Sequence, residues 1–237
     1  MDDLTSRFLD SFATIEKHLR RMLDANRSAT FNELLGRAVS RDRSVRRLRD
    51  QLKTLGELRN FLVHEYKSDQ PLAVPSESTV LRIQIIRDEL LSPVRLVDLF
   101  RPPVEICSPS DPIGVAAKRM LDGSFSQVPV YSGNTLMGLL TSETVARWLA
   151  AQLADGQGIL EERPVQEVMS HEEGTHSYVV MGRSATVDDA LSKFDDHMHA
   201  GKVLDAIILT HNGSKRERPV GIVTATDQPK LRSAIRV

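Results

Sequence analysis

Apolar residues in the first part of the chain recur at steps of three and four, which is the period of an amphipathic α-helix. Four such stripes follow one another, and polar or turn-forming residues separate them. They consist of Phe8, Phe12, Ile15, Leu19 and Met22; Leu34, Leu35 and Ala38; Val45, Leu48, Leu52, Leu55 and Leu62; and Val80, Ile83, Ile86 and Leu90. Residues 1–93 are therefore predicted to form a helical bundle.

Local signals place the ends of these helices. Thr30 and Glu33 form a capping-box pattern directly before the second stripe. Gly56 lies inside the third stripe and predicts a weak point or a break there. The fourth helix is predicted to begin near residues 76–79 and to stop at Pro93.

The rest of the chain contains one pattern twice. Each copy runs strand, helix, strand, turn, strand, helix, with apolar residues at equivalent places. The matching segments are Val97–Phe100 with Val165–Met169, Asp111–Met120 with Ala185–Phe194, Val128–Val130 with Ala206–Ile208, and Gly138–Thr144 with Gly221–Asp227. An internal repeat of this kind predicts two copies of one supersecondary unit.

The segment Gly221–Asp227 carries the clearest chemistry in the repeat. A strand ends at Thr224, and Asp227 opens a short helical run. The free N–H groups and the positive dipole end of a helix N-terminus favour phosphate, and the Thr224 hydroxyl adds a donor. The Asp227 carboxylate can accept hydrogen bonds from a ribose diol. The alternative is that Thr224 or Asp227 simply caps the helix.

The two copies together resemble a tandem pair of CBS (cystathionine β-synthase) domains. The resemblance implies an α+β fold: an N-terminal α-helical bundle, then two β-α-β-β-α CBS repeats at residues 94–154 and 163–237. It also implies that the copies pack through their sheets and leave two clefts, commonly for adenosine-containing ligands such as AMP, ADP or ATP. The ligand-binding positions that it implies are Thr224, Asp227, Thr141, Asp111, Ser126, Val128, Ala185, Ala206 and Ile207.

The copies differ at the last position of the repeated motif, where Thr144 corresponds to Asp227. Threonine offers one neutral hydroxyl, whereas a charge-assisted hydrogen bond to a carboxylate is roughly twice as strong as a neutral one. One competent cleft and one weak or vacant cleft are therefore expected. The sequence leaves open whether Ser126–Val128 or Asp205–Ile207 completes the cleft of Asp227.

Composition indicates the compartment. The chain of 237 residues is 41% hydrophobic and 27% charged, as is ordinary for a globular protein. Its single cysteine, Cys107, excludes an intramolecular disulfide and fits a reducing compartment. The sequence shows no signal peptide and no apolar run near the roughly 18 residues of a membrane helix. A cytoplasmic protein without membrane contact is expected.

Charge is distributed unevenly, at +3 over residues 1–96 and −4 over the remainder, which suggests two different partners. Basic side chains gather at Arg37, Arg41, Arg43, Arg46, Arg47 and Arg49. Such a cluster suits a phosphate backbone, although no aromatic residue interleaves it for base stacking. An ordinary solvated face explains the same pattern equally well.

The segment Arg59–Tyr66 is the most unusual part of the predicted bundle. On a helix, Arg59 continues the third apolar stripe, where an unpaired arginine is costly. Asn60 and His64 lie one turn apart on an adjacent face. His64 can exchange protons near neutral pH and Arg59 can clamp a phosphate, which are the two functions needed to cleave RNA without a metal.

These residues resemble the signature of HEPN-type helical domains, in which Arg59, Asn60, His64 and Tyr66 occupy the motif positions. The resemblance implies a ribonuclease that dimerises so that two motifs face one cleft. In one branch of the family the tyrosine is adenylylated, which makes Tyr66 a candidate modification site. The alternative is that Arg59 forms a structural ion pair and His64 is an ordinary surface histidine.

The combined hypothesis is a regulatory homodimer in which the CBS pair binds an adenine nucleotide and controls an RNA-acting helical domain. The alternative is a non-enzymatic nucleotide sensor whose helical domain only dimerises or docks a partner. The CBS-like part contains no nucleophile–base pair. No metal site is expected, because the acidic and histidine residues at 195–199 lie in a predicted loop and lack a zinc pattern.

Overall fold

The computed structural model describes residues 3–64, 73–101, 103–154, 162–174 and 176–235. The chain divides into two compact units, one formed by Met1–Val94 with Ser233–Val237 and the other by Arg95–Arg232. Each unit has its own core. Both repeats of the predicted CBS pair lie in the second unit.

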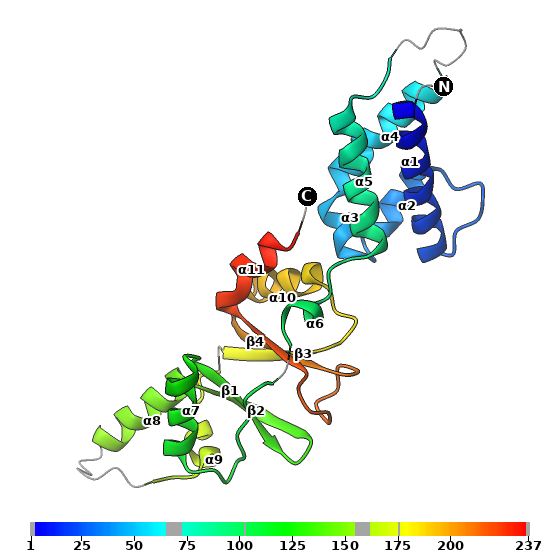
Figure 1. Cartoon of the computed structure of the whole chain (residues 1–237). Helices are drawn as coiled ribbons and strands as arrows, with labels where there is room; N and C mark the ends of the chain where they lie inside the picture. Colours follow the sequence, from blue (N-terminus) through cyan, green and yellow to red (C-terminus); the bar gives the residue numbers. More distant parts are fainter. Residues whose placement is uncertain (1–2, 65–72, 102, 155–161, 175, 236–237) are drawn as a thin grey trace. The chain divides into compact units, whose positions relative to one another are not determined.

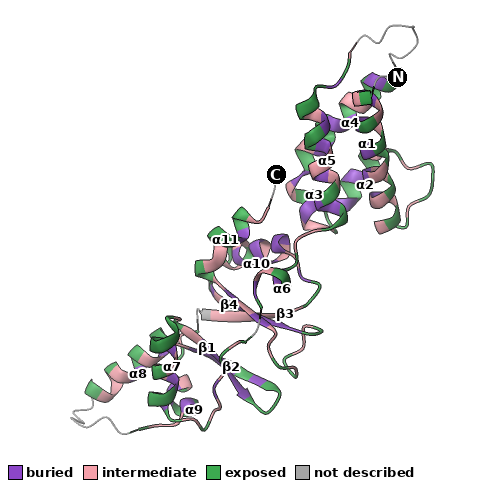
Figure 2. Cartoon of the chain, in the orientation of Figure 1, coloured by how far each residue is buried: buried purple, intermediate pink, exposed green. Residues whose placement is uncertain are grey.

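The first unit is helical, as the hydrophobic pattern predicted (Figure 1). Its helices are α1 (Asp3–Met22), α2 (Phe31–Ala38), α3 (Arg43–Arg47), α4 (Arg49–His64) and α5 (Glu77–Leu91). Figure 2 shows their buried residues on the faces that the helices turn toward one another. The largest of these side chains are Phe8, Ile15, Leu19, Leu34, Leu48, Leu52, Ile83 and Ile86.

The capping residues lie where the sequence predicted them. The Thr30 hydroxyl accepts from the Glu33 backbone N–H at 3.3 Å, and the Thr30 N–H donates to the Glu33 carboxylate at 2.7 Å. Ser76 caps α5 by accepting from the Thr79 N–H at 3.2 Å. Both caps satisfy N–H groups that have no partner within their helix.

The predicted break at Gly56 is wrong. The helix is interrupted at Leu48, between α3 and α4, and Gly56 lies inside α4. A Cβ atom at residue 56 would come within 3.0 Å of the Phe31 ring. Gly56 therefore allows α4 to approach α2 closely, which is a packing role and not a helix-ending one.

The second unit contains the two repeats in the predicted order, and the predicted fold class is confirmed. The first repeat comprises α6 (Leu96–Leu99), α7 (Ile113–Gly123), β1 (Gln127–Ser132), β2 (Thr135–Thr141) and α8 (Ser142–Ala154). The second comprises α9 (Val165–Val168), η1 (Met169–His171), β3 (His176–Gly182), α10 (Val187–His199), β4 (Val203–Thr210), β5 (Gly221–Thr224), η2 (Ala225–Asp227) and α11 (Gln228–Ser233).

The two sheets of this unit differ in size. β3 pairs parallel with β4, and β4 pairs antiparallel with β5, so the second repeat has three strands. The first repeat has the antiparallel pair β1–β2, and its predicted first strand is reduced to one parallel bridge between Cys107 and Val130. Pro103 and Pro109 flank this bridge, and because proline lacks an N–H it shortens a ladder.

Apolar faces of the two sheets pack against each other and join the repeats. The cluster contains Tyr131, Leu136 and Leu139 from β1 and β2, and Ala206 and Ile208 from β4. A side-chain amide strengthens the junction, because Gln127 Nε2 donates to the Asp205 carbonyl at 3.0 Å. Gln127 and Asp205 occupy equivalent places in the two repeats, directly before Val128 and Ala206.

One local prediction in the second repeat is wrong. Residues 195–199 were expected in a loop, but they belong to α10, where His197 and His199 bond to carbonyls one turn back. β4 ends at Thr210 and β5 begins at Gly221, so Asn212 and Gly213 lie in a long turn between two antiparallel strands. The backbone N–H and the side-chain amide of Asn212 both donate to the Glu217 carboxylate at 2.7 Å, and these bonds order the turn.

The α2 cap gives the first prediction. Thr30→Ala should lower the free energy of unfolding by about 1 kcal/mol, because it removes the acceptor for the Glu33 N–H. Hydrogen bonds from the backbone and side chain of Thr30 lower the pKa of Glu33, so the carboxylate stabilises the fold above its unfolded pKa and loses this effect as pH falls. Urea unfolding should therefore show Glu33→Gln less stable than wild type at pH 7, with the gap closing toward pH 3. Thr54→Ala, at an exposed hydroxyl in α4, is the control; an equal loss for Thr30→Ala and Thr54→Ala would contradict the capping role.

Cys107 gives a prediction for the second unit. The thiol is 2% exposed, and burial, reinforced by Asp111, raises its pKa to about 11. Since the thiolate is the reactive form, iodoacetamide at pH 8 should label native protein slowly and urea-unfolded protein rapidly. Ser132→Cys in a Cys107→Ser background, at an exposed turn, should label rapidly in the native state. Rapid native labelling of Cys107 itself would show that the first repeat does not keep its core closed.

Candidate functional site

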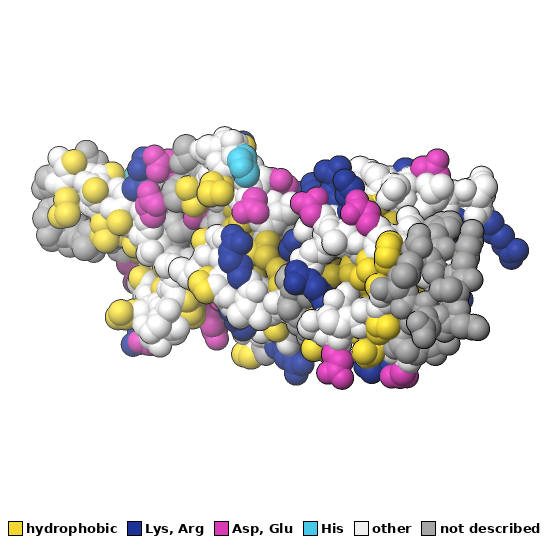
Figure 3. Space-filling model, turned by 90° about the horizontal axis from the view of Figure 1, so that it is seen from above, with side chains coloured by type: hydrophobic (Ala, Val, Ile, Leu, Met, Phe, Trp, Pro, Cys, Tyr) yellow, Lys and Arg dark blue, Asp and Glu magenta, His cyan; other side chains and the backbone are white. Residues whose placement is uncertain are grey.

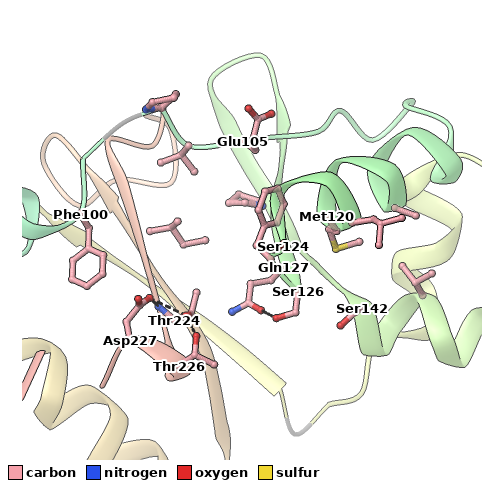
Figure 4. A pocket seen from close by; sticks show the side chains of 18 of the residues that line it. Phe100, Glu105, Met120, Ser124, Ser126, Gln127, Ser142, Thr224, Thr226 and Asp227 are labelled. Atoms are coloured by element: carbon pink, nitrogen blue, oxygen red, sulfur yellow. Dashed lines mark hydrogen bonds between the residues drawn. The ribbon is translucent and has the colours of Figure 1, made fainter. Parts of the chain in front are cut away.

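A cleft of about 920 Å³ lies in the second unit and takes its walls from both repeats (Figure 4). The first repeat contributes the segment after α6, one side of α7, the turn before β1 and the start of α8. The second repeat contributes the end of β5, η2 and the start of α11. Its volume is within the range of roughly 300–1,000 Å³ that is usual for small-molecule sites.

Thr224 and Asp227 form one wall of this cleft, as the motif predicted. Asp227 Oδ2 accepts from the Thr224 N–H at 2.8 Å and from the Thr224 hydroxyl at 2.9 Å. This is a capping box, so the capping alternative describes a real interaction. These bonds use one carboxylate oxygen, and no described residue is bonded to the other oxygen, Oδ1. Because Asp227 lines the cleft, Oδ1 can accept from a further donor such as a ribose hydroxyl.

Ser126 lies on the wall that faces these residues, and this answers the question that the sequence left open (Figure 4). Ser124, Ser126 and Gln127 of the first repeat line the cleft together with Thr224 and Asp227 of the second. The Ser126 hydroxyl donates to Gln127 Oε1, and Gln127 in turn bonds across to Asp205. Hydrogen bonds therefore connect the cleft wall that carries Ser126 to the junction between the repeats.

Six of the residues that the resemblance implied do not line the cleft. Four of them are buried apolar residues in strands or next to a strand. The other two bond to neighbouring residues, Asp111 to Arg119 and Thr141 to Thr144. The six residues are Asp111, Val128, Thr141, Ala185, Ala206 and Ile207.

Asp111 does not cap α7. The helix starts at Ile113 with Pro112 as its N-cap residue, so Asp111 lies one position too early. Its carboxylate accepts from the Ser108 N–H at 3.1 Å and pairs with Arg119 at 3.2 Å. Asp111 therefore orders the start of α7 within the first repeat.

The first copy of the motif has a closed geometry. Thr141 Oγ1 accepts from the Thr144 N–H at 3.1 Å, and the two hydroxyls lie 2.9 Å apart. Thr144 is 3% exposed, so its hydroxyl is turned into the start of α8. The threonine thus keeps the cap of the repeated motif but presents no carboxylate.

Lys230 is a cleft residue that sequence reasoning missed. Its ammonium donates to the Leu99 carbonyl at 3.0 Å and lies 4.2 Å from the centre of the Phe100 ring. A basic residue stands three positions after the end of the motif in both copies, because Arg147 follows Thr144 as Lys230 follows Asp227. That regularity was the available signal for Lys230; nothing in the sequence pointed to Phe100 or Glu105.

The predicted ribonuclease motif lies on α4 in the first unit, which carries Arg59, Asn60 and His64. Arg59 is half-buried; it donates to Asn60 Oδ1 at 3.3 Å, and its guanidinium carbon is 6.0 Å from the Phe12 ring centre. Within the described part of the chain Arg59 has no carboxylate partner, so the expected structural ion pair is absent there. The His64 side chain and Tyr66 lie outside the described residues.

The arginine cluster is partly used inside the first unit. Arg47 forms an ion pair with Glu89, Arg46 donates to the Val39 carbonyl at 3.0 Å, and Arg37 donates to the Leu23 carbonyl at 3.3 Å. On the face shown in Figure 3, basic and acidic side chains lie side by side and do not form one uniform patch. These contacts engage three of the six arginines within the first unit.

Comparison with known proteins identifies the first repeat. The family model "CBS domain" matches residues 96–151. This segment is a CBS domain. The second repeat follows the same order of elements, which supports a tandem CBS module in residues 96–232.

One curated relative is the CBS domain-containing protein CBSCBSPB3 of Arabidopsis thaliana, which is 31% identical over 133 residues. The match takes in 56% of this chain but only 22% of that protein's length.

Solved structures of CBS proteins are also similar. The CBS domain pair of protein MJ0100 in complex with 5′-methylthioadenosine and S-adenosyl-L-methionine is 20% identical, with a TM-score of 0.42 over 60% of this chain and 97% of that one. CBSX2 in complex with AMP is 16% identical, with a TM-score of 0.44 over 61% and 99%. The CBS-domain protein ATU1752 from Agrobacterium tumefaciens is 20% identical, with a TM-score of 0.43 over 58% and 92%.

In the described ranges, no group of three or more His, Cys, Asp or Glu side chains is arranged to hold a metal ion. Among the same residues, no helix has the length and apolar character that crossing a membrane requires.

Proposed function

We propose that this protein is a regulator whose CBS module binds an adenosine-containing ligand in the cleft of Asp227 and thereby controls the N-terminal helical domain. The ligand classes are AMP, ADP, ATP or a related adenosyl compound. The protein works as a homodimer, since two-fold dimers are the commonest closed assembly. Two of the similar structures, those of MJ0100 and CBSX2, contain adenosine derivatives, which supports this choice of class.

One observation carries the proposal: Asp227 lines a cleft of suitable size and has one carboxylate oxygen that no described residue is bonded to. The capping box fixes the side chain, so no rotamer freedom is lost when Oδ1 accepts from a ligand hydroxyl. Ser126 and Ser142 supply further hydroxyls, and Met120, Phe125 and Ile222 supply an apolar surface for a base. A few placed polar groups on a mainly apolar wall are typical of a small-molecule site.

The corresponding prediction concerns Asp227 and Thr144. Asp227→Ala should weaken binding of AMP by about 1.5–3 kcal/mol, the usual scale for a hydrogen bond to a charged group. Thr144→Ala should leave the affinity nearly unchanged, because Thr144 is buried and does not line the cleft. Isothermal titration calorimetry measures both, and Asp227→Asn, which retains a neutral acceptor for the cap, separates loss of charge from loss of the cap. Equal losses at Asp227 and Thr144 would contradict the assignment.

A second candidate function is metal-independent RNA cleavage by the helical domain. Arg59 favours it, because its guanidinium is half-buried beside Asn60 and has no carboxylate partner among the described residues. A guanidinium in such a place can clamp a phosphate and stabilise charge in a transition state. His64, on the same helix, would supply the proton transfer. Tyr66 is retained as a candidate modification site.

This candidate predicts cleavage of RNA in the presence of EDTA, with a cyclic phosphate product, because the substrate's own 2′-hydroxyl attacks. Arg59→Ala and His64→Ala should each lower the rate about a hundredfold or more. Lys53→Ala, an exposed change on the same helix, should have no effect. If purified protein leaves several RNAs intact with and without adenine nucleotides, the helical domain is a dimerisation or docking module.

A further inference from the structure

We propose that the Asp227 cleft selects adenosyl compounds whose tail is neutral or positively charged and discriminates against nucleoside di- and triphosphates. The inference rests on the proposed function, since it presumes that the cleft takes an adenosyl ligand. It goes further by naming the charge class of that ligand.

The charge balance of the cleft is acidic. Among the described lining residues, the side chains that are charged at neutral pH are Glu105, Asp227 and Lys230, which sum to −1. None of the described lining residues is an arginine. A di- or triphosphate chain carries several negative charges and is held in proteins by guanidinium or ammonium groups. Placed in this cleft, it would meet more negative than positive charge.

Lys230 is the one cationic side chain among the described lining residues, and it contacts other residues of the cleft wall and of the segment beside it. Lys230 donates to the Leu99 carbonyl at 3.0 Å, and its ammonium lies 4.2 Å from the centre of the Phe100 ring. Both partners belong to the segment that enters the first repeat. A phosphate chain would have to compete with these contacts for the ammonium, whereas a neutral tail leaves them intact.

The rest of the cleft suits a ligand of low charge. Figure 4 shows Ser126 and Gln127 across from Thr224 and Asp227, so hydroxyl and carboxylate groups face the same space. Glu105 lies on the entering segment, away from Thr224 and Asp227. It forms no hydrogen bond or ion pair with another described residue. The carboxylates of Glu105 and Asp227 favour a cationic tail, such as a sulfonium, by direct attraction.

The test is calorimetric titration of the full chain with adenosine, S-adenosylmethionine, AMP, ADP and ATP, at 150 mM salt, with and without Mg²⁺. Adenosine and S-adenosylmethionine should bind at least about tenfold more tightly than ATP, and the ratio should shrink at higher salt because charges are screened. Mg²⁺ is included because it neutralises part of the charge of a triphosphate. It should therefore reduce the difference in affinity between ATP and adenosine.

Charge variants test the cause of the selectivity. Glu105→Lys should raise the affinity for ATP about fivefold and lower that for S-adenosylmethionine, with adenosine nearly unchanged. Asp122→Asn, at a carboxylate that pairs with Lys118 and does not line the cleft, is the matched control and should change none of the affinities.

The outcomes separate the two levels of the argument. If ATP binds as tightly as adenosine or more tightly, the charge selection is wrong while the nucleotide-sensing function stands. If Glu105→Lys leaves the ATP affinity unchanged, the charge of Glu105 does not set the selectivity and the inference is overturned. If none of the five compounds binds, the proposed function itself fails.

Discussion

The packing of one sheet on the other within the second unit is the constraint on which the candidate site depends. Tyr131, Leu136 and Leu139 of the first repeat share a buried cluster with Ala206 and Ile208 of the second. Burying these faces removes apolar surface from water, and this drives the two repeats together. The cleft takes walls from both repeats, so it exists only while this packing holds. The bond from Gln127 to the Asp205 carbonyl lies at the same junction and connects it to the cleft wall.

The repeat also shows how one local structure serves two purposes. In both copies a threonine ends the strand and bonds to the residue three positions later, so the start of the following helix is capped. Thr141 accepts from the Thr144 N–H, and the Thr224 hydroxyl donates to the Asp227 carboxylate. Where that residue is Asp227, the cap leaves a second oxygen in the cleft. Where it is Thr144, the cap consumes the hydroxyl and the side chain is buried. The cap therefore leaves a carboxylate oxygen available at Asp227, whereas Thr144 is buried and does not line the cleft.

Much of the fold could be predicted because it depends on local signals. Helical stripes, the Thr30 cap and the repeat of strand and helix are each contained in a few neighbouring residues. The predictions that were wrong concern places with tertiary contacts: Gly56 lies inside α4 where the Phe31 ring packs close to it, and residues 195–199 belong to α10, which packs on β4. The sequence could not decide which segment faces Asp227, since that follows from how the repeats pack.

The candidate site could be predicted only in part, because Thr224 and Asp227 follow from the repeated motif and Ser126 follows from the resemblance to CBS domains. Thr224, Asp227 and Ser126 were identified, but Lys230 was missed, because a lone basic residue in a short helix has no pattern of its own. Alignment of the two copies shows Arg147 at the equivalent place, and this is the comparison that would have found it.

The measurement that tests the account most directly is a crystal structure of the full chain grown with adenosine. The account predicts ligand density between Ser126 and Asp227, with a ribose hydroxyl within hydrogen-bond distance of Asp227 Oδ1 and the bonds from Thr224 to Oδ2 unchanged. Density beside Thr141 and Thr144 instead, or a bound ligand that leaves Asp227 Oδ1 without contact, would contradict it.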